Sequence, residues 1–227
     1  MTALLEIEGL TGGYRDTNVL FEISVKIEAG SLLGVLGRNG VGKTTLARLV
    51  QGEIKASQGD IRFDGQPMGN QPAHARRHMG VGYMPQTAMV FDDLTVQENL
   101  SLGSSGKPPD RYFDLFPRLA ERLKQPAGTM SGGERKILSF VRTMIEDTKL
   151  IILDEPTEGV QPENINHMAD CLRERVAEGA GVLLCEQNLN LLSDVADWFL
   201  GLDSGRVTMT GSGNMTTRKD LNAVLSL

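Results

Sequence analysis

The feature that most constrains the fold of this chain is the stretch from residue 37 to residue 44, GRNGVGKT, which fits the pattern G-x-x-x-x-G-K-[ST] in full. A continuous apolar run, Leu32–Leu36, comes directly before it, and helical spacing follows from Lys43 to about Gln51. A strand, a glycine-rich turn and a helix in this order bring backbone N–H groups and the positive end of a helix to one point. The sequence therefore predicts a phosphate-binding loop within an α/β fold.

This loop and the start of the following helix are expected to contact a nucleotide. Lys43 would reach the β- and γ-phosphates, which makes it a catalytic candidate, and the hydroxyl of Thr44 would coordinate Mg²⁺. The alternative is a glycine-rich turn that fits the pattern by chance, and the flanking strand and helix disfavour it. The predicted binding residues are Gly37, Arg38, Asn39, Gly40, Val41, Gly42, Lys43, Thr44 and Thr45.

A second candidate site lies at the end of another apolar strand, Leu150–Leu153, which leads directly into Asp154 and Glu155. Ligands of open α/β sheets bind at the carboxyl ends of the strands. Asp154 would bind Mg²⁺ through water, and Glu155 would polarise the attacking water as a general base. Because solvation alone also makes strand ends acidic, this pair is significant mainly in combination with the phosphate loop.

Strand and helix signals alternate towards both ends of the chain and predict a mainly parallel sheet covered on both faces. Two strands with alternating apolar residues, 4–10 and 20–27, predict an N-terminal antiparallel β subdomain. Between the two candidate sites the strand signals vanish, and residues 112–123 and 134–146 show helical spacing. We therefore predict one domain, 1–227, that consists of a nucleotide-binding core, 1–86 and 150–227, and a helical subdomain, 87–149.

The composition limits the possible partners. The net charge of −6 provides no basic footprint for nucleic acid. No apolar run approaches the roughly 20 residues that cross a bilayer, and the N-terminus has no basic region typical of a signal peptide. A cytoplasmic location is the expectation that follows. The two cysteines, Cys171 and Cys185, have no metal-binding spacing and are expected to be reduced, buried thiols.

A third motif, Met130-Ser131-Gly132-Gly133-Glu134, lies between the two candidate sites. It resembles the signature motif of ABC ATPases, LSGGQ or LSGGE, in sequence and in position. Ser131 and the N–H groups of the glycines, at the start of a helix, would form a second anion site. Ser131 and Glu134 can also form a helix capping box, and the two roles are compatible.

The resemblance to ABC ATPases covers nearly the whole chain and implies further site residues. Tyr14 matches the aromatic residue that stacks on adenine, and Gln86 matches the loop glutamine that contacts Mg²⁺ and senses the membrane partner. Residues 156–160 match the loop that meets the opposing subunit. Gln187 occupies the switch position after the next strand, which makes it a catalytic candidate.

The resemblance also implies the assembly. Two such domains pack head to tail, and ATP with Mg²⁺ lies between the Lys43 loop of one subunit and the Ser131 motif of the other. The helical subdomain would contact the membrane subunits. The protein would then lie at the inner face of the cell membrane without crossing it.

The chain departs from the common family pattern at the switch position, where Gln187 replaces histidine, and at Gln161, which replaces a loop aspartate. After the signature, Arg135-Lys136 replaces a glutamine-containing pair. The sequence around Gln187 is similar to an ATPase subunit of branched-chain amino acid importers, and residues 155–162 look like the related urea importer subunit. In this hydrophobic amino acid and amide uptake group, the expected partners are a second ATPase subunit, usually non-identical, two permeases and an extracytoplasmic solute-binding protein. A homodimer and either solute class remain alternatives.

Three other functions are alternatives to this one. A kinase or GTPase with the same phosphate loop would have no use for the Ser131 motif, and the chain has no evident N-K-x-D guanine motif. A non-transport ABC protein would be expected to carry coiled-coil inserts or tandem domains. A nucleotide-binding regulator with weak hydrolysis stays open because of Gln187.

Overall fold

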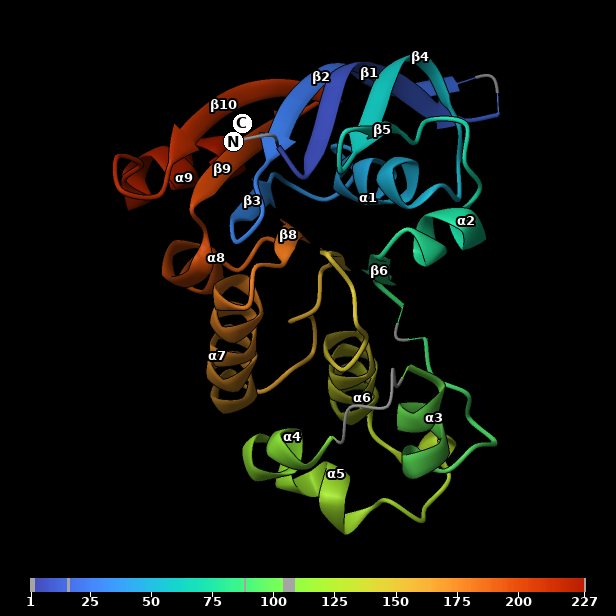
Figure 1. Ribbon diagram of the computed structural model, residues 1–227. Coiled ribbons are helices and arrows are strands. Elements are labelled where there is room, and N and C mark those ends of the chain that lie inside the picture. Colours follow the sequence, from blue (N-terminus) through green and yellow to red (C-terminus); the bar gives the residue numbers. More distant parts are fainter. Residues whose placement is uncertain (1–2, 16, 88, 104–108, 227) are drawn as a thin grey trace.

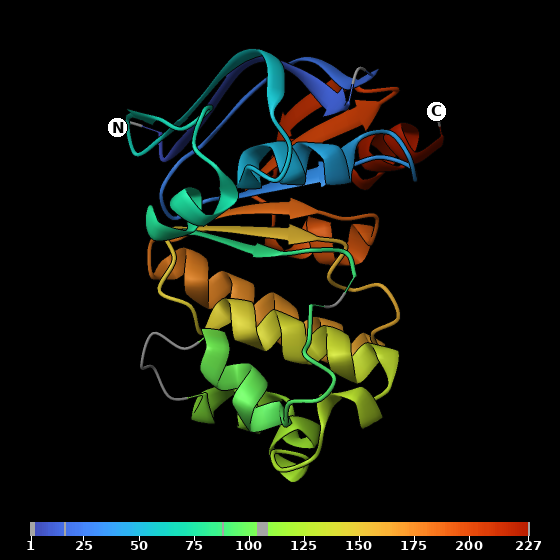
Figure 2. The ribbon, with the colours of Figure 1, turned by 90° about the vertical axis from the view of Figure 1, so that its right-hand side faces the viewer.

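The structure is a computed structural model that describes residues 3–15, 17–87, 89–103 and 109–226. The predicted single domain and helical subdomain include residues outside these ranges, namely 1–2, 16, 88, 104–108 and 227. Two sheets and several helices stack in layers, with the antiparallel sheet at the top of Figure 1 and α3, α4 and α5 at the bottom. Figure 2 shows the central sheet edge-on between α1 above it and α6 and α7 below it.

The antiparallel sheet has the order β2-β1-β4-β5. Its long strands β1 and β2 pair from Leu5 opposite Ile27 to Tyr14 opposite Thr17, as the alternating pattern of the N-terminal segments predicts. The first two strands are longer than expected and extend to the hairpin that carries Tyr14. The strands are β1 (Leu5–Tyr14), β2 (Thr17–Ile27), β4 (Ala56–Phe63) and β5 (Gln66–Pro67).

The central sheet has the order β10-β9-β3-β8-β7-β6, and its strands are parallel except for the edge strand β10. Its strands are β3 (Leu32–Leu36), β6 (Val81–Met84), β7 (Leu150–Asp154), β8 (Gly181–Cys185), β9 (Trp198–Asp203) and β10 (Arg206–Ser212). Every residue of β3, β7 and β8 is buried, which explains their continuous apolar sequences. The carboxyl ends of these three neighbouring strands therefore open onto one edge of the sheet.

The apolar strands separate two hydrophobic cores, because successive side chains point to opposite faces. In β7, Ile151 and Leu153 pack into the core that is shared with α6 and α7. Leu150 and Ile152 pack on the other face, in the core that surrounds α1. Burial on both faces fixes the strand register, and with it the position of Asp154 at the strand end.

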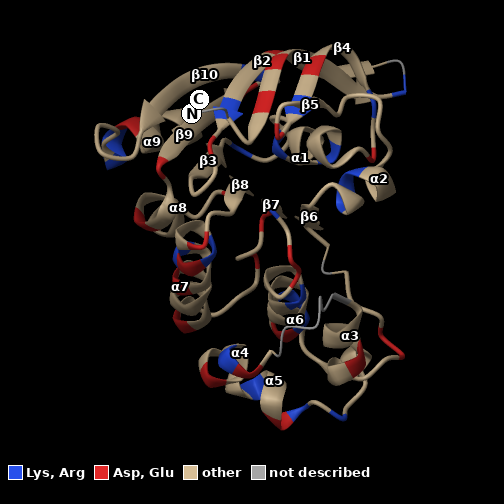
Figure 3. Cartoon of the chain, in the orientation of Figure 1, with Lys and Arg blue, Asp and Glu red and all other residues tan. Residues whose placement is uncertain are grey.

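The helices in the described ranges are α1 (Lys43–Gln51), α2 (Ala73–His78), α3 (Val96–Gly103), α4 (Asp110–Leu115), α5 (Pro117–Glu121), α6 (Gly132–Met144), α7 (Pro162–Ala177), α8 (Leu189–Val195) and α9 (Arg218–Ser226), with a 3₁₀ turn at Ala127–Thr129. No helix within them is long and apolar enough to cross a membrane. Charges of both signs lie on the antiparallel sheet and on the helices, whereas β3, β6 and β8 of the central sheet carry none (Figure 3).

One helix prediction is wrong. The helical spacing over 112–123 predicts a single helix, but the structure has two short helices with a break at Phe116, whose φ is −126° and ψ 69°. Pro117 explains the break, because a proline disfavours helical conformation in the residue before it and starts helices well at their first position. The side chain of Phe116 is buried against Phe140 and His167 in edge-to-face contacts, with ring centroids 6.5 and 5.9 Å away. The subdomain boundaries at residues 86 and 150 stay a prediction.

Candidate nucleotide site

The phosphate loop connects β3 to α1, and its last glycine starts the helix. Gly42 is the N-cap of α1 with φ 116°, and a Cβ atom there would lie 2.5 Å from Cδ2 of Leu20. Both the backbone angle and the lack of space therefore demand glycine. No described side chain caps this helix end. The first N–H groups of α1 are thus available to an anion.

The Lys43 side chain lies buried inside this loop, with 4% of its surface exposed. Its Nζ donates hydrogen bonds to the carbonyl oxygens of Gly37 at 2.8 Å and Arg38 at 3.0 Å. The same atom lies 3.1 Å from Oε1 of Glu155. The loop lysine and the carboxylate after β7 therefore form a buried ion pair, which links the two predicted sites.

Glu155 accepts hydrogen bonds from two glutamines as well. Nε2 of Gln86 donates to Oε2 at 3.0 Å, and Nε2 of Gln187 donates to Oε1 at 2.9 Å. Gln187 also donates to Oδ1 of Asn39 in the phosphate loop at 2.6 Å. The structure therefore brings together the candidates from four separate segments around one carboxylate.

The backbone of Glu155 is itself unusual. Its φ is 48°, in the left-handed region, and its N–H donates to the carbonyl of Cys185 at 2.8 Å. This conformation is disfavoured for a residue with a Cβ atom, by roughly 1–2 kcal/mol. Such strain concentrates at functional sites. Here it turns the chain sharply at the end of β7 and places the Glu155 side chain beside the phosphate loop.

Asp154 is fully buried beneath the loop. The Thr44 hydroxyl donates to its Oδ1 at 3.2 Å, whereas Oδ2 has no hydrogen-bond partner among the described residues. Burial raises the pKa of Asp154 to about 6, although the Thr44 hydrogen bond acts in the opposite direction. A buried carboxylate oxygen without a partner, next to a hydroxyl, fits the oxygen ligands that Mg²⁺ prefers.

The residues around Lys43 line a hollow of about 300 Å³. Tyr14, at the end of β1, lies at its rim with 39% of its surface exposed, and the guanidinium of Arg48 lies 5.9 Å from its ring centroid. Two predicted loop residues have side chains directed elsewhere. Arg38 is paired with Asp203 at 3.7 Å, and Val41 packs into the core, and neither residue is among those that line the hollow. The lining residues are Tyr14, Val19, Asn39, Gly40, Gly42, Lys43, Thr44, Thr45, Gln86 and Glu155.

The Ser131 motif lies apart from this hollow. Ser131 is the N-cap of α6, where Ser131 N–H donates to Oε2 of Glu134 at 2.9 Å and Glu134 N–H donates to Oγ of Ser131 at 3.3 Å. The predicted capping box is therefore present. Gly132 has no other described atom within 4 Å of a Cβ position, whereas at Gly133 that position lies 2.7 Å from the carbonyl oxygen of Gly159. The second glycine is thus required by close contact with the loop after β7.

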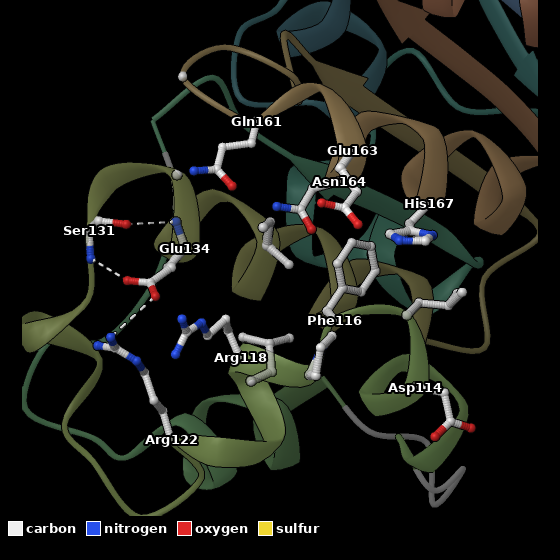
Figure 4. A pocket seen from close by; sticks show the side chains of 16 residues that line it. Asp114, Phe116, Arg118, Arg122, Ser131, Glu134, Gln161, Glu163, Asn164 and His167 are labelled. Atoms are coloured by element: carbon white, nitrogen blue, oxygen red, sulfur yellow. Dashed lines mark hydrogen bonds and ion pairs between the residues drawn. The ribbon is translucent and has the colours of Figure 1, made fainter.

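Ser131, Gly133 and Glu134 line a separate cavity of about 750 Å³, drawn in Figure 4. In that view, Arg118 and Arg122 approach Glu134 from one side, and Gln161 and Asn164 lie on the opposite side. Arg122 forms an ion pair with Glu134 at 3.4 Å. Within one chain, the structure therefore does not bring the Ser131 motif to the hollow that contains Lys43.

Two buried charged residues near Glu155 were not predicted from the sequence. The first is Glu186, which lies directly after β8 and has 4% of its surface exposed. Its carboxylate accepts hydrogen bonds from the Thr157 N–H at 3.2 Å, the Thr157 hydroxyl at 2.7 Å, the Gln187 N–H at 2.7 Å and the Asn188 N–H at 3.1 Å. It ties the loop after β7 to the loop after β8. Its place after an apolar strand, like that of Asp154, is the signal that could have identified it.

The second missed residue is Lys136 in α6, with 5% of its surface exposed. No sequence signal indicates its burial, because lysine is almost always exposed unless it is paired.

The raised pKa of Asp154 predicts a pH-dependent stability without nucleotide. The pKa of about 6 means that the folded chain holds this proton up to that pH, whereas the unfolded chain releases it near the ordinary aspartate pKa of 3.8. The free energy of unfolding therefore falls as pH rises through this window. Asp154→Asn cannot lose a proton, so between pH 4 and pH 7 it should gain about 2–3 kcal/mol relative to the unmodified chain. Urea unfolding in EDTA measures this difference, and parallel pH profiles would contradict the prediction.

Comparison with known proteins identifies the family. The family model described as ABC transporter matches residues 20–158. The branched-chain amino acid transport ATP-binding protein BraG of Pseudomonas aeruginosa is 34% identical, over 98% of this chain and 99% of its own. LivF of Archaeoglobus fulgidus, named a probable protein of the same kind, is 33% identical over 93% of both chains. The lipopolysaccharide export ATP-binding protein LptB of Haemophilus influenzae is 31% identical over 92% of this chain and 91% of its own.

Solved structures agree with the fold. One, titled as an ATP-binding subunit of an ABC transporter, superposes with a TM-score of 0.85 at 28% identity and covers 99% of this chain and 100% of its own. A nucleotide-free ATP-binding cassette shares the fold with a TM-score of 0.82 at 24% identity, over 100% of this chain and 96% of its own. The sequence prediction of an ABC-type P-loop fold is confirmed. The chain therefore belongs to the ABC transporter family, as an ABC-type ATPase.

Proposed function

We propose that this chain is the ATP-hydrolysing subunit of an importer, and that Glu155 is its general base. The observation that carries the proposal is the buried Glu155 carboxylate, which Lys43, Gln86 and Gln187 hold beside the phosphate loop. A carboxylate fixed in this way can orient a water molecule and accept its proton while the terminal phosphate is attacked.

The phosphate loop and its neighbours bind the nucleotide in this proposal. The N–H groups of residues 37–45 bind phosphate oxygens, and Tyr14 stacks on the adenine from the rim of the hollow. Lys43 exchanges its contact with Glu155 for the β- and γ-phosphates, which leaves the carboxylate free to act as a base. Binding of ATP would thereby switch Glu155 from an ion-paired group to an active one.

Three residues would hold Mg²⁺. The Thr44 hydroxyl and Gln86 would bind it directly, and Asp154 through water. The ion would neutralise charge on the phosphates during hydrolysis. The Asp154 oxygen without a described partner and the raised pKa of this carboxyl support the assignment, because a cation would compensate the buried charge.

The Ser131 motif acts on the nucleotide of a second subunit. Ser131, Gly133 and Glu134, with Gly132 between them in the motif, line a different cavity from the one around Lys43, so we infer that a nucleotide contacts both only between two chains. The second subunit is a related, non-identical ATPase or another copy of this chain. Binding of ATP would favour the closed pair, because the nucleotide gains contacts from both subunits only there.

We infer import of branched-chain or other hydrophobic amino acids from the relatives, since the two proteins named for such transport are more similar than the one named for lipopolysaccharide export. Urea-like amides are the alternative cargo. The expected partners are two permeases and an extracytoplasmic solute-binding protein, with this chain at the inner membrane face. Exposed Phe91 and Leu102, in the span 87–149, support a contact surface for the permeases.

Glu155→Gln tests the catalytic assignment. The amide keeps the shape of the side chain but cannot accept a proton, so turnover should fall about a hundredfold or more while the affinity for ATP stays within about threefold. Steady-state ATPase assays and nucleotide titration measure the two effects. Asp64→Asn, which changes an exposed carboxylate paired with Lys149, is the control. Undiminished turnover of Glu155→Gln would remove Glu155 from the base role.

Gln187 should limit the rate of hydrolysis, because an amide can donate a hydrogen bond but cannot carry a proton. Gln187→Ala loses the bonds to Glu155 and Asn39 and should lower kcat by about tenfold. Gln187→His should raise kcat above that of the unmodified chain. The prediction is wrong if the first change costs no activity and the second gains none, with and without the partner subunits.

A further inference from the structure

Lys136 lies two residues beyond Glu134 in α6, on the helix that begins with the Ser131 motif. Its neighbour Arg135 is a useful comparison, because the Arg135 side chain is 38% exposed and lies 3.7 Å from Asp92 at the surface. The Lys136 side chain is only 6% exposed. An ammonium group is costly to bury without partners, so its contacts must account for its position.

Lys136 has two such partners, each on a different loop. Its Nζ donates to the backbone carbonyl oxygen of Gln86, the proposed Mg²⁺ ligand. The same atom lies 3.9 Å from Oε2 of Glu158, in the loop after β7. One ammonium on α6 therefore contacts both loops that border Glu155.

The contacts continue from these loops to the proposed base. Nε2 of Gln86 donates to Glu155 at 3.0 Å and lies 3.4 Å from Oε2 of Glu158. Glu155 in turn lies 3.1 Å from Lys43. Lys136 on α6 thus contacts the backbone of Gln86, the Gln86 side chain contacts Glu155, and Glu155 contacts the phosphate loop. Among these contacts, Lys136 is the only residue of α6.

The carboxylates around Lys136 also favour a fixed position of its ammonium group. Burial lowers the pKa of Lys136, and the carboxylates of Glu158, Glu186, Glu155 and Asp154 oppose this shift. Lys43 is expected to turn towards the phosphates when ATP binds. Lys136 would then remain as a positive charge next to these carboxylates and would keep the Gln86 loop in place.

We propose that Lys136 is a positioning residue that joins the signature helix to the Gln86 loop and the Glu158 loop, and so couples the position of the Ser131 motif to that of Glu155 within one subunit. The inference rests on the proposed hydrolytic role of Glu155. If α6 moves when a second subunit binds, the contact of the Lys136 ammonium group with the Gln86 carbonyl would move Gln86 as well. The adjacent Arg135, which contacts a different surface segment, has no such connection in the described contacts.

Hydrogen exchange of the nucleotide-free protein tests the link without relying on activity. Lys136→Met removes the charge and keeps an unbranched side chain, so exchange in residues 81–87 and 155–161 should rise by about tenfold while α1 and β3 stay protected. Lys149→Met, which removes an exposed ion pair with Asp64, is the matched control and should leave both loops unchanged. Unchanged loop exchange in Lys136→Met, or an equal rise throughout the chain, would overturn the proposal.

Kinetics supply the second readout. In Lys136→Met, kcat should fall about tenfold while the KM for ATP stays within about twofold, because the base is misplaced and the phosphate loop is intact. When Glu158→Gln is added to Lys136→Met, it should lower kcat less than it does in the unmodified chain, since Lys136 and Glu158 share one contact. Independent, additive effects of the two changes on kcat would contradict the link.

If Lys136→Met does not fold, Lys136→Gln, which keeps a donor for the Gln86 carbonyl, should show the same effects at smaller size. An inactive unmodified protein would overturn the proposed function, whereas the exchange result still decides the role of Lys136.

Discussion

The arrangement of the site depends on the buried contact between Lys43 and Glu155. A lysine inside a glycine-rich loop and a carboxylate at a strand end are each costly to bury alone, and at 3.1 Å each compensates the other. Lys43 also donates hydrogen bonds to the carbonyls of Gly37 and Arg38, so the pair is linked to the backbone of the phosphate loop. In the proposed function, ATP would change the site directly, because its phosphates would compete with Glu155 for the same ammonium group.

The central sheet makes this contact possible. β3 and β7 both pair with β8, so their carboxyl ends lie close together at one edge, and burial on both faces fixes their register. The loop after β8 contributes Gln187, and Glu186 ties that loop to Thr157. Residues far apart in the sequence therefore meet at one carboxylate, because each of them lies in a segment that follows a strand of this sheet.

The contiguous parts of the site could be predicted from the sequence. The phosphate loop, the strand that ends in Asp154 and the capping box at Ser131 are each encoded by a few neighbouring residues, whose types follow from local chemistry. Resemblance to a family added Tyr14, Gln86 and Gln187, which no local pattern identifies. Their roles in binding and catalysis are proposals that the structure supports by placing Gln86 and Gln187 beside Glu155.

Features that depend on contacts between distant segments could not be predicted. The left-handed conformation of Glu155 follows from how β7 and β8 meet, and the burial of Lys136 follows from the packing of α6 against the Gln86 loop. The break at Phe116 was a different kind of omission. Pro117 indicates a helix break at Phe116, but the helical spacing over 112–123 favours one continuous helix.

In the proposed function, Lys43 and Ser131 of opposite subunits bind one nucleotide. Molar mass measured by light scattering tests it on Glu155→Gln with Mg-ATP, for the chain alone and together with a co-expressed second ATPase subunit. We predict an ATP-dependent doubling of mass that Ser131→Arg abolishes, while a single Ser131→Arg chain binds ATP as before. Dimers that are unaffected by Ser131→Arg, or loss of ATP binding by the single Ser131→Arg chain, would contradict the account.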